Sequence, residues 1–291
     1  MYSVGQAEHW TRRLARSHYE NFLVVTWLLP RQLHQAMFNV YAYCRTVDDL
    51  GDEAEGDRLQ LLADWERQLE DCFSRRALDH PVYVALAKTI REYDLPIEPF
   101  RRLIQANRQD QLVTRYETYA QLLDYCQYSA NPVGRLVLML FGYRDEPRFE
   151  LSDATCTALQ LANFWQDVAR DYQAGRIYIP LEDMRRFGCS ESELASGMFH
   201  ASWQALIEFE VERARELFRM GEQLVPLVAR RLQIDLRLFT LGGIEVLNRI
   251  EAQGFDVLTR RPTVGAWAQL GLLVRALFSA FAAPKAVVRH A

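Results

Sequence analysis

Residues 31–57 read RQLHQAMFNVYAYCRTVDDLGDEAEGD, an apolar stripe that runs into a dense group of acids. In the first part, apolar side chains recur at spacings of three and four residues, the period of one face of an α-helix. These side chains are Leu33, Ala36, Met37, Val40, Tyr41 and Cys44. The last ten residues, 48–57, contain six acids and no base. The stretch therefore predicts a helix that packs one face into a core and ends in concentrated negative charge.

The same helical period extends over most of the chain. Apolar stripes with this spacing cover residues 59–73, 116–143, 151–172, 202–232 and 235–254. Helices are expected to begin or end near prolines, which stand at Pro81, Pro96, Pro147, Pro180 and Pro262. Pro132 lies inside a stripe and predicts a kink or a break there. We find no strand-like alternation, linker or repeat, so the sequence predicts one all-α domain over residues 1–291, with about ten helices and a frayed tail after residue 284.

The composition argues against several classes of protein. There are 34 basic and 38 acidic residues, and this net charge of −4 gives no reason to expect nucleic acid as a partner. With 14 glycines and 10 prolines, the chain has few of the residues that turn-rich β folds need. The five cysteines form no Cys-x-x-Cys pair, which favours a reducing compartment and argues against zinc. The chain has no Gly-x-Gly-x-x-Gly, P-loop or Gly-x-Ser-x-Gly pattern, so we expect no nicotinamide cofactor, nucleoside triphosphatase or ordinary serine hydrolase.

Two segments bear on location. The first 22 residues mix acids with bases and have no apolar core, so they do not form a signal peptide. The longest apolar stretch, residues 264–284, has Arg275 near its middle, which is unfavourable inside a bilayer. We expect this stretch to form a core helix, and association with a membrane surface is the alternative. The sequence thus predicts a cytoplasmic protein, with peripheral contact at the inner membrane surface left open.

The acidic run places two aspartates four residues apart. Asp48 and Asp52 share one helix face, with Cβ atoms about 5–6 Å apart, and their charges repel unless a cation lies between them. A second set recurs as Asn163, Asp167 and Asp171. A single pair is typical of a solvated helix face. Two such faces opposite each other would form an oxygen-rich cavity suited to Mg²⁺, which takes a few carboxylates and completes its shell with water and phosphate oxygens.

Two arginines accompany these acids. Arg45 precedes Asp48 by three residues on the same face, and Arg176 follows Asp171 across a glycine that permits a tight turn. Either arginine could be a structural ion-pair partner of the aspartates. Together with a metal, both would also neutralise a departing diphosphate.

Three motifs, in this order and spacing, resemble the squalene/phytoene synthase family. They are YAYCRTVDDLGDE (41–53), YCQYSANPVG (125–134) and NFWQDVARDYQAGRIYIP (163–180). The likeness extends from about residue 15 to residue 261. It implies an isoprenoid synthase helical bundle with a central active-site cavity. It also implies Mg²⁺, with Mn²⁺ as a substitute, bridging the protein to the diphosphate of a prenyl diphosphate substrate.

The resemblance also implies roles for individual residues. As metal ligands it implies Asp48, Asp52, Asn163, Asp167 and Asp171. As substrate-binding residues it implies His18, Tyr19, Glu20, Asn21, Phe22, Arg45, Gln160 and Arg176. As active-site residues that act on the reacting carbocation or on water, it suggests Tyr41, Tyr125 and Gln166.

Departures from the family pattern narrow the activity. Condensing members usually carry arginine where this chain has Gln166, glutamate where it has Arg170, and tyrosine where we align Gly243. Their Ser-x-Ser-Phe pattern is replaced by residues 19–22, Tyr-Glu-Asn-Phe. These changes resemble the branch that makes hydroxysqualene from presqualene diphosphate and water in hopanoid biosynthesis. There Glu20, Asn21 or Gln166 would position the water.

Two other functions stay open. A condensing sister enzyme would join two prenyl diphosphates head to head into presqualene or phytoene diphosphate. A non-catalytic helical scaffold is the more remote alternative, because such a chain is expected to lose its aspartates. For an enzyme, the resemblance also implies functional association with other enzymes of the squalene pathway.

Overall fold

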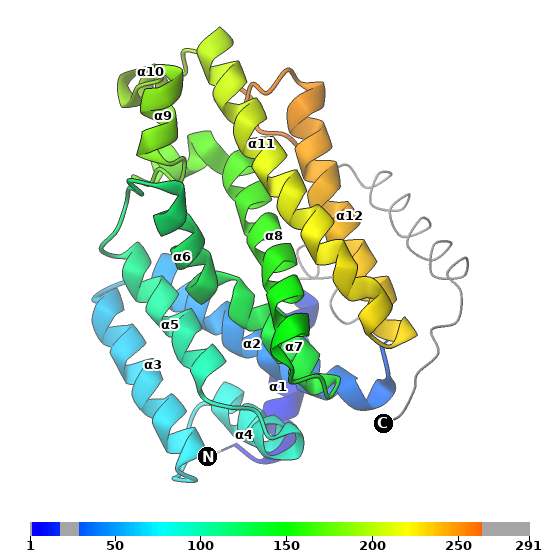
Figure 1. The fold of residues 1–291 in the computed structure, drawn as a ribbon. Coiled ribbons are helices and arrows are strands. Elements are labelled where there is room, and N and C mark those ends of the chain that lie inside the picture. Colours follow the sequence, from blue (N-terminus) through cyan, green and yellow to red (C-terminus); the bar gives the residue numbers. More distant parts are fainter. Residues whose placement is uncertain (1, 18–28, 264–291) are drawn as a thin grey trace. The chain divides into compact units, whose positions relative to one another are not determined.

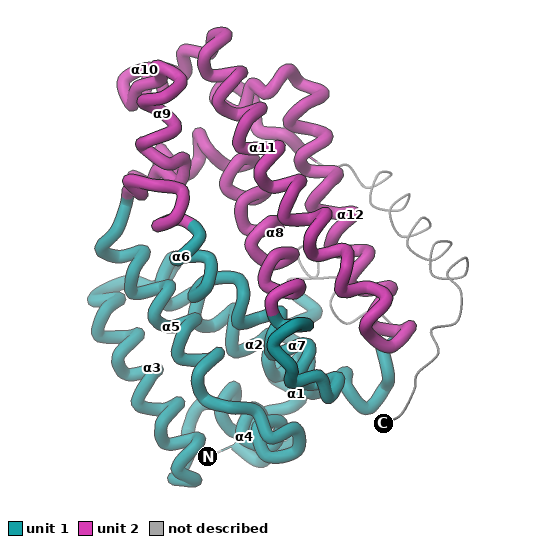
Figure 2. Tube along the Cα trace, in the orientation of Figure 1, with its two compact units in different colours: residues 1–114, 123–149 teal, residues 115–122, 150–291 magenta. Residues whose placement is uncertain are grey.

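The structure, a computed structural model, describes residues 2–17 and 29–263, which form α-helices joined by short turns (Figure 1). Within these ranges no β-strand is present, and an isolated bridge between Arg115 and Ile177 is the one trace of sheet pairing. This confirms the predicted all-α class. Two compact units divide the chain, one with residues 1–114 and 123–149 and the other with residues 115–122 and 150–291 (Figure 2). That they form a single domain stays a prediction.

Unit 1, the first of these, contains the N-terminal helices. They are α1 (Val4–Ser17), α2 (Arg31–Asp52), α3 (Arg58–Phe73), α4 (Pro81–Tyr93), α5 (Glu98–Asp110), most of α6 (Tyr119–Ser129) and α7 (Asn131–Leu140). Within this unit α2 is the central element, since it contacts α1, α3, α4, α5 and α7. The helix that carries the first aspartate motif is therefore held on several sides.

A cluster of aromatic side chains fixes α2 in this unit. The ring of Tyr43 is fully buried and packs edge-on against Phe100, with ring centroids 5.0 Å apart, and against Tyr83 at 6.0 Å. Its hydroxyl donates to the Phe100 carbonyl oxygen at 2.9 Å. Burial of rings this large is a major stabilising contribution, and the satisfied hydroxyl avoids a desolvation cost. Tyr43 thus anchors α2 to α4 and α5.

Unit 2, the second of the two, contains the C-terminal helices. They are most of α8 (Glu146–Gln173), α9 (Leu181–Phe187), α10 (Glu191–Ser196), α11 (Ala201–Gly221), the 3₁₀ helix η1 (Glu222–Leu227) and α12 (Arg230–Ala252). Helix α11 packs against α9 and α12. It also approaches α8 closely at Gly221, where an added Cβ would lie 2.0 Å from Thr155 Oγ1. The second aspartate motif lies on α8 in this unit.

The prolines act largely as predicted. Pro81 begins α4, Pro147 lies in the first turn of α8, and Pro180 precedes α9. At Pro132 the expected break occurs, because α6 ends at Ser129 and α7 begins at Asn131. The stripe over residues 202–232 was predicted to be continuous, which is wrong. A 3₁₀ turn that contains Pro226 separates α11 from α12, since proline lacks the backbone donor that would continue a helix.

The N-terminal helix α1 was not predicted from the periodicity. Its two buried residues are Ala7 and Thr11, which are small or polar and leave no apolar stripe to recognise. Thr11 donates to Asn39 of α2 at 2.7 Å, so polar contacts hold part of this helix in place.

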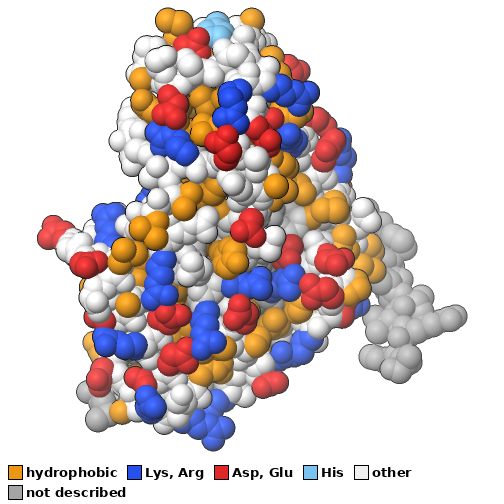
Figure 3. Space-filling view, turned by 60° about the vertical axis from the view of Figure 1, so that its left-hand side comes forward, with side chains coloured by type: hydrophobic (Ala, Val, Ile, Leu, Met, Phe, Trp, Pro, Cys, Tyr) orange, Lys and Arg blue, Asp and Glu red, His pale blue; other side chains and the backbone are white. Residues whose placement is uncertain are grey.

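Acidic and basic side chains are interspersed over the face drawn in Figure 3. Ion pairs join many of these side chains within each unit. In unit 1, Arg108 Nη1 lies 2.6 Å from Glu66 Oε2, and in unit 2, Arg115 Nε lies 3.0 Å from Glu191 Oε1. Pairs on the surface contribute little individually, about 0–1 kcal/mol each.

None of the helices in residues 2–17 and 29–263 is long and apolar enough to cross a membrane. The apolar stretch 264–284 lies outside the described residues. Its predicted role as a core helix or a membrane-surface segment therefore stays a prediction.

Candidate functional site

The first aspartate motif forms the last turn of α2, where Asp48 and Asp52 are both reached by solvent. The C-terminal end of a helix carries a partial negative charge, so acids there deepen the local negative potential. Arg45 Nη2 lies 2.6 Å from Asp49 Oδ1 and 2.7 Å from Glu53 Oε1. The structure thus places Arg45 in ion pairs with two neighbouring acids, and its contact with a diphosphate stays a prediction.

Helix α5 supplies polar contacts to this turn. Asn107 Nδ2 donates to Asp48 Oδ1 at 3.3 Å, and Gln111 Nε2 donates to the Gly51 carbonyl oxygen at 3.0 Å. Surrounding protein atoms raise the pKa of the Asp48 carboxyl above the usual aspartate range, although solvent reaches it. The bond from Asn107 acts to lower that pKa, and the charge of Asp52 raises it. A bound cation would remove much of this electrostatic cost.

Both tyrosines predicted to be active-site residues are buried in unit 1. Tyr41 lies on α2, seven residues before Asp48 and therefore on the same helix face. Burial raises its pKa. The hydroxyl of Tyr125 on α6 donates to Asp110 Oδ2 at 2.6 Å. Because Asp110 lies at the end of α5, this bond ties Tyr125 to the same helix that contacts Asp48.

The second motif occupies one face of α8 in unit 2. Gln160, Asn163, Asp167 and Asp171 follow at spacings of three and four residues. Asn163 is exposed and the other three are half-buried. The four predicted residues therefore share a face, as the spacing requires.

Asp167 is held by arginines. Arg261 Nε donates to Asp167 Oδ1 at 2.6 Å, and Arg261 Nη2 donates to Oδ2 at 3.0 Å. Arg170 Nη1 lies 3.4 Å from Asp167 Oδ1. This fork is the geometry in which arginine binds carboxylates most strongly. A predicted metal ligand is thus engaged by a cation from 94 residues further along the chain.

Gln166, next to Asp167, contacts the same distant segment. Its Nε2 donates to the Pro262 carbonyl oxygen at 2.7 Å, and its side chain is buried. Residues 166 and 167 therefore both form hydrogen bonds with the segment at residues 261 and 262. The predicted role of Gln166 in positioning water stays a prediction, and the structure shows that its amide also holds a backbone carbonyl.

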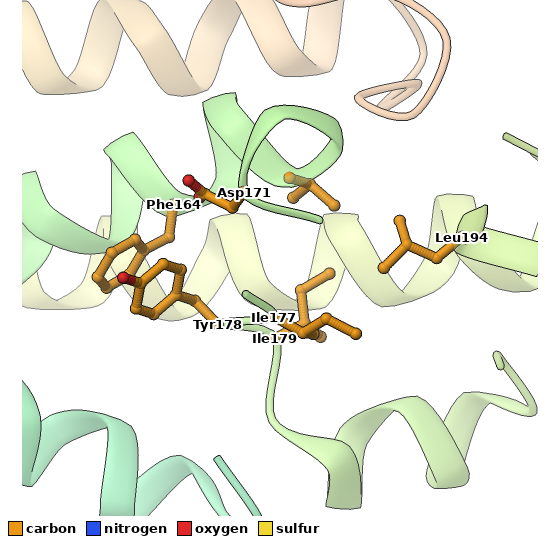
Figure 4. A pocket seen from close by; sticks show the side chains of 7 residues that line it. Phe164, Asp171, Ile177, Tyr178, Ile179 and Leu194 are labelled. Carbon is orange, nitrogen blue, oxygen red and sulfur yellow. The ribbon is translucent and has the colours of Figure 1, made fainter. Parts of the chain in front are cut away.

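Asp171 borders a small apolar pocket in unit 2 (Figure 4). The ring of Phe164 stacks on that of Tyr178, with centroids 3.8 Å apart and planes inclined by 9°. The turn before this pocket follows the prediction, because Gly175 has φ +85°. Beyond it, the backbone N–H of Arg176 donates to the Asp171 carbonyl oxygen at 2.8 Å. The backbone of Arg176, the predicted cation, therefore contacts the end of the second motif.

At Gly243, where a tyrosine is usual in condensing relatives, the space is filled. A Cβ added there would lie 2.3 Å from Phe218 Cζ and 2.9 Å from Leu159 Cδ2. The residue is buried on α12. The structure therefore has no room for a side chain at this position without movement of α8 or α11 side chains.

Five predicted substrate-binding residues lie outside the described residues. They are His18, Tyr19, Glu20, Asn21 and Phe22. Their roles stay predictions.

The family model described as squalene/phytoene synthase matches residues 15–268. The chain belongs to this family. The match covers the whole range of the predicted resemblance and confirms it. Enzymes of the prenyltransferase type in isoprenoid biosynthesis make up the squalene/phytoene synthase family.

Relatives with known structures or names agree with this assignment. The chain is 47% identical to squalene synthase HpnC from Alicyclobacillus acidocaldarius, with a TM-score of 0.83 over 87% of this chain and 95% of that one. It is 27% identical to a dehydrosqualene synthase solved with a ligand, with a TM-score of 0.87 over 95% and 97% of the two chains. The 15-cis-phytoene synthase of Synechococcus elongatus is 31% identical over 96% of this chain and 94% of its own. These similarities confirm the isoprenoid synthase fold.

The donor atoms of the family's two motifs suit Mg²⁺ to different degrees. No three His, Cys, Asp or Glu side chains in the described part of the chain converge to hold a metal by themselves. Mg²⁺ needs no such cage, since one or two carboxylates with water and phosphate oxygens suffice. Asp48 and Asp52, at the negative end of α2, fit this description. At Asp167 a metal would compete with Arg261.

The aspartate motifs belong to different units, Asp48 and Asp52 to unit 1 and the set on α8 to unit 2. That they line one cavity and share metal ions stays a prediction. Asn107, Asp110 and Arg261 were not found from the sequence. Their contacts with motif residues span 59, 15 and 94 positions, and no local pattern indicates partners at such separations.

Proposed function

We propose that this enzyme converts presqualene diphosphate and water to hydroxysqualene and diphosphate. The observation that carries the proposal is Gln166. Condensing relatives usually have an arginine there, whereas this chain has a neutral amide. Its Nε2 donates a hydrogen bond to the Pro262 carbonyl oxygen. A reaction that starts from presqualene diphosphate handles one diphosphate instead of two, so it does not need the cation that an arginine at position 166 would offer to a second, incoming diphosphate.

Two further findings support this choice. The chain is 47% identical to a protein named squalene synthase HpnC and 31% identical to a phytoene synthase, which favours a substrate of the squalene type over one of the phytoene type. The aligned tyrosine of condensing members is replaced by Gly243, and Phe218 fills the space beside it. The departures therefore lie both in the sequence and in the packing of unit 2.

In this proposal the acidic and the basic residues have different roles. Asp48, Asp52, Asn163, Asp167 and Asp171 would hold Mg²⁺. When bound, the ion supplies the positive charge that stabilises a leaving diphosphate. Arg45 and Arg176 would add cationic charge that neutralises the diphosphate. The carbon–oxygen bond to the diphosphate breaks, and its electron pair leaves with the diphosphate.

The cyclopropylcarbinyl cation that remains rearranges against aromatic faces. Tyr41 and Tyr125 would provide such faces, because a ring stabilises a nearby cation through its quadrupole. A water oxygen then forms the new carbon–oxygen bond and releases one proton to solvent. Gln166 would orient this water, or Glu20 or Asn21 in the segment outside the described residues.

A second candidate is head-to-head condensation to presqualene or phytoene diphosphate. It is favoured by the names of the relatives, since phytoene synthases from cyanobacteria and plants are 27–33% identical to this chain. The two candidates differ in substrate. The hydrolytic enzyme needs presqualene diphosphate, and the condensing enzyme consumes farnesyl or geranylgeranyl diphosphate.

The deciding experiment supplies each substrate separately with MgCl₂ in water enriched in ¹⁸O. With presqualene diphosphate as substrate, we expect mass spectrometry to detect hydroxysqualene that carries one ¹⁸O from the water. With farnesyl or geranylgeranyl diphosphate we expect no coupled product. Formation of presqualene or phytoene diphosphate would contradict the proposal. Turnover should be lost in Asp48→Asn and Asp167→Asn, whereas no turnover of any prenyl diphosphate by the wild type would favour a scaffold.

We also propose a cytoplasmic location with peripheral contact at the inner membrane surface, and functional association with other enzymes of the squalene pathway. The apolar character of the substrate and product supports both. Flotation of the protein with lipid vesicles tests the membrane contact.

A further inference from the structure

The amide of Asn107 lies between α5 and the aspartate turn of α2, both within unit 1. Its side chain is buried. Its Nδ2 donates to the Leu103 carbonyl oxygen at 3.1 Å and to Asp48 Oδ1 at 3.3 Å. The amide is thus shared between its own helix and a predicted metal ligand.

Gly51 makes room for this amide. A Cβ at Gly51 would lie 2.2 Å from Asn107 Oδ1, 3.0 Å from its Cγ and 3.1 Å from its Cβ. Gly51 lies in the last turn of α2 and does not have a positive φ, so the backbone does not require glycine there. The absence of a side chain serves the close approach of Asn107.

The residue that follows the end of α5 adds a second contact. Gln111 Nε2 donates to the Gly51 carbonyl oxygen at 3.0 Å and to the Asn107 carbonyl oxygen at 3.1 Å. Asn107 and Gln111 therefore bracket Gly51 on one face of α5. The position of the amide relative to Asp48 is set by packing and hydrogen bonds together.

We propose that Asn107 is a positioning residue that orients the Asp48 carboxylate for metal binding. The Asp48 side chain lies near the charge of Asp52 at the negative end of α2, and without a donor it would be free to turn away from that charge. Holding one carboxylate oxygen fixes the plane of the group. Partners of this kind around metal ligands typically account for 10- to 100-fold in metal affinity. This inference rests on the metal-binding role of Asp48 in the proposed function.

If Asn107 had only a structural role, replacing it would change the stability of the protein and leave its metal affinity unchanged. A leucine of similar shape would fill the same space, and it would relieve the desolvation cost of a buried amide. Stability and metal affinity therefore have to be measured separately.

The experiment titrates purified protein with Mn²⁺ in the absence of any prenyl substrate and measures free Mn²⁺ by electron paramagnetic resonance. We expect Asn107→Leu to bind Mn²⁺ about 10- to 100-fold more weakly than wild type. Asp48→Asn defines the binding that depends on the first motif. The matched control is Asn39→Leu, which removes a buried amide from α2 that donates to Ala85 and Thr89. It should lower stability and leave the Mn²⁺ affinity unchanged.

The close contact between Gly51 and the Asn107 side chain provides a second test. Gly51→Ala should push Asn107 aside and weaken Mn²⁺ binding as much as Asn107→Leu. The double variant Gly51→Ala with Asn107→Ala removes the clash, so it should recover thermal stability and still bind Mn²⁺ weakly. Wild-type affinity in Asn107→Leu or in the double variant would overturn the inference, and so would a wild type without Asp48-dependent binding. Because no product is measured, failure of the hydroxysqualene assignment would leave these results unaffected.

Discussion

Both oxygens of the Asp167 carboxylate accept from Arg261, at 2.6 and 3.0 Å. The side chain of Arg261 is 40% exposed, so solvent screens the attraction. A pair of this kind is worth about 0.2–1 kcal/mol. A cation that binds Asp167 therefore meets a competitor of modest strength and defined geometry.

Replacing Arg261 with glutamine removes that competitor. We expect Arg261→Gln to bind Mn²⁺ up to about five-fold more tightly than wild type without substrate, since 1.4 kcal/mol corresponds to tenfold. The measurement is the Mn²⁺ titration followed by electron paramagnetic resonance that is described above for Asn107. Arg249→Gln is the control, because it breaks an ion pair with Glu245 on α12 at 2.8 Å and touches no predicted ligand. Unchanged or weaker binding would show that Arg261 does not compete with the cation.

Among the helices, α12 shows how closely unit 2 is packed. Its two consecutive glycines have opposite surroundings. A Cβ at Gly242 would meet nothing within 4 Å, whereas a Cβ at Gly243 would lie 2.3 Å from Phe218 Cζ. One glycine is required by packing and its neighbour is not.

Alanine at these two positions should therefore have opposite effects. Gly243→Ala should lower the free energy of unfolding by about 1–3 kcal/mol, because the ring of Phe218 has to move. Gly242→Ala should raise it by up to about 1 kcal/mol, because alanine is the better helix former. Urea denaturation followed by circular dichroism measures both. Equal changes in the two variants would contradict the packing at Gly243.

Helix positions could be predicted from the sequence where apolar residues recur at the helical period or where a proline marks a break. Pro132 predicted the break between α6 and α7, and the stripe at residues 59–73 corresponds to α3. The periodicity failed for α1, whose buried residues are Ala7 and Thr11, and at Pro226, where apolar residues continue through a 3₁₀ turn. A stripe records which residues are buried, and it does not record whether the backbone between them stays helical.

Unit 2 contains two buried acidic side chains that share one arginine. Glu210 of α11 is fully buried, and Asp183 of α9 is nearly so. Arg213 Nη1 lies 2.7 Å from Asp183 and 3.4 Å from Glu210, and its guanidinium lies 4.1 Å from the rings of Tyr119 and Phe209. Burial raises the pKa of Glu210 to about 8, Arg213 lowers it, and Asp183 raises it. One guanidinium thus serves two carboxyl groups, and burial favours the protonated form of Glu210.

The stability of the protein should depend on pH through Glu210. Its pKa is higher in the folded chain than its ordinary value of 4.5, so the folded state binds this proton more tightly. The stabilisation is complete below pH 4.5 and is lost as the pH rises towards about 8. We expect Glu210→Gln to unfold with a weaker pH dependence than wild type between pH 5 and about 8.5. Thermal unfolding at a series of pH values measures this, with the exposed Glu208→Gln as control. Parallel profiles for wild type and Glu210→Gln would contradict it.

The candidate site could be predicted where its chemistry is local. The spacing of Asp48 with Asp52, and of Asn163 with Asp167 and Asp171, follows from the helical period alone. The partners of these residues could not be predicted, since Asn107 and Arg261 reach them through tertiary packing. Neighbouring helices set which rotamers are available, and a single sequence contains no pattern that states which helices are neighbours.

The packing at Gly243 also limits the order in which this enzyme can change. The ring of Phe218 and the side chain of Leu159 have taken the space beside the glycine, so reintroducing a large side chain in one mutational step meets a steric block. Smaller residues at 218 or 159 have to come first, and each alone leaves a cavity. An engineer who wants to place a tyrosine at position 243 therefore has to change residues 159, 218 and 243 together.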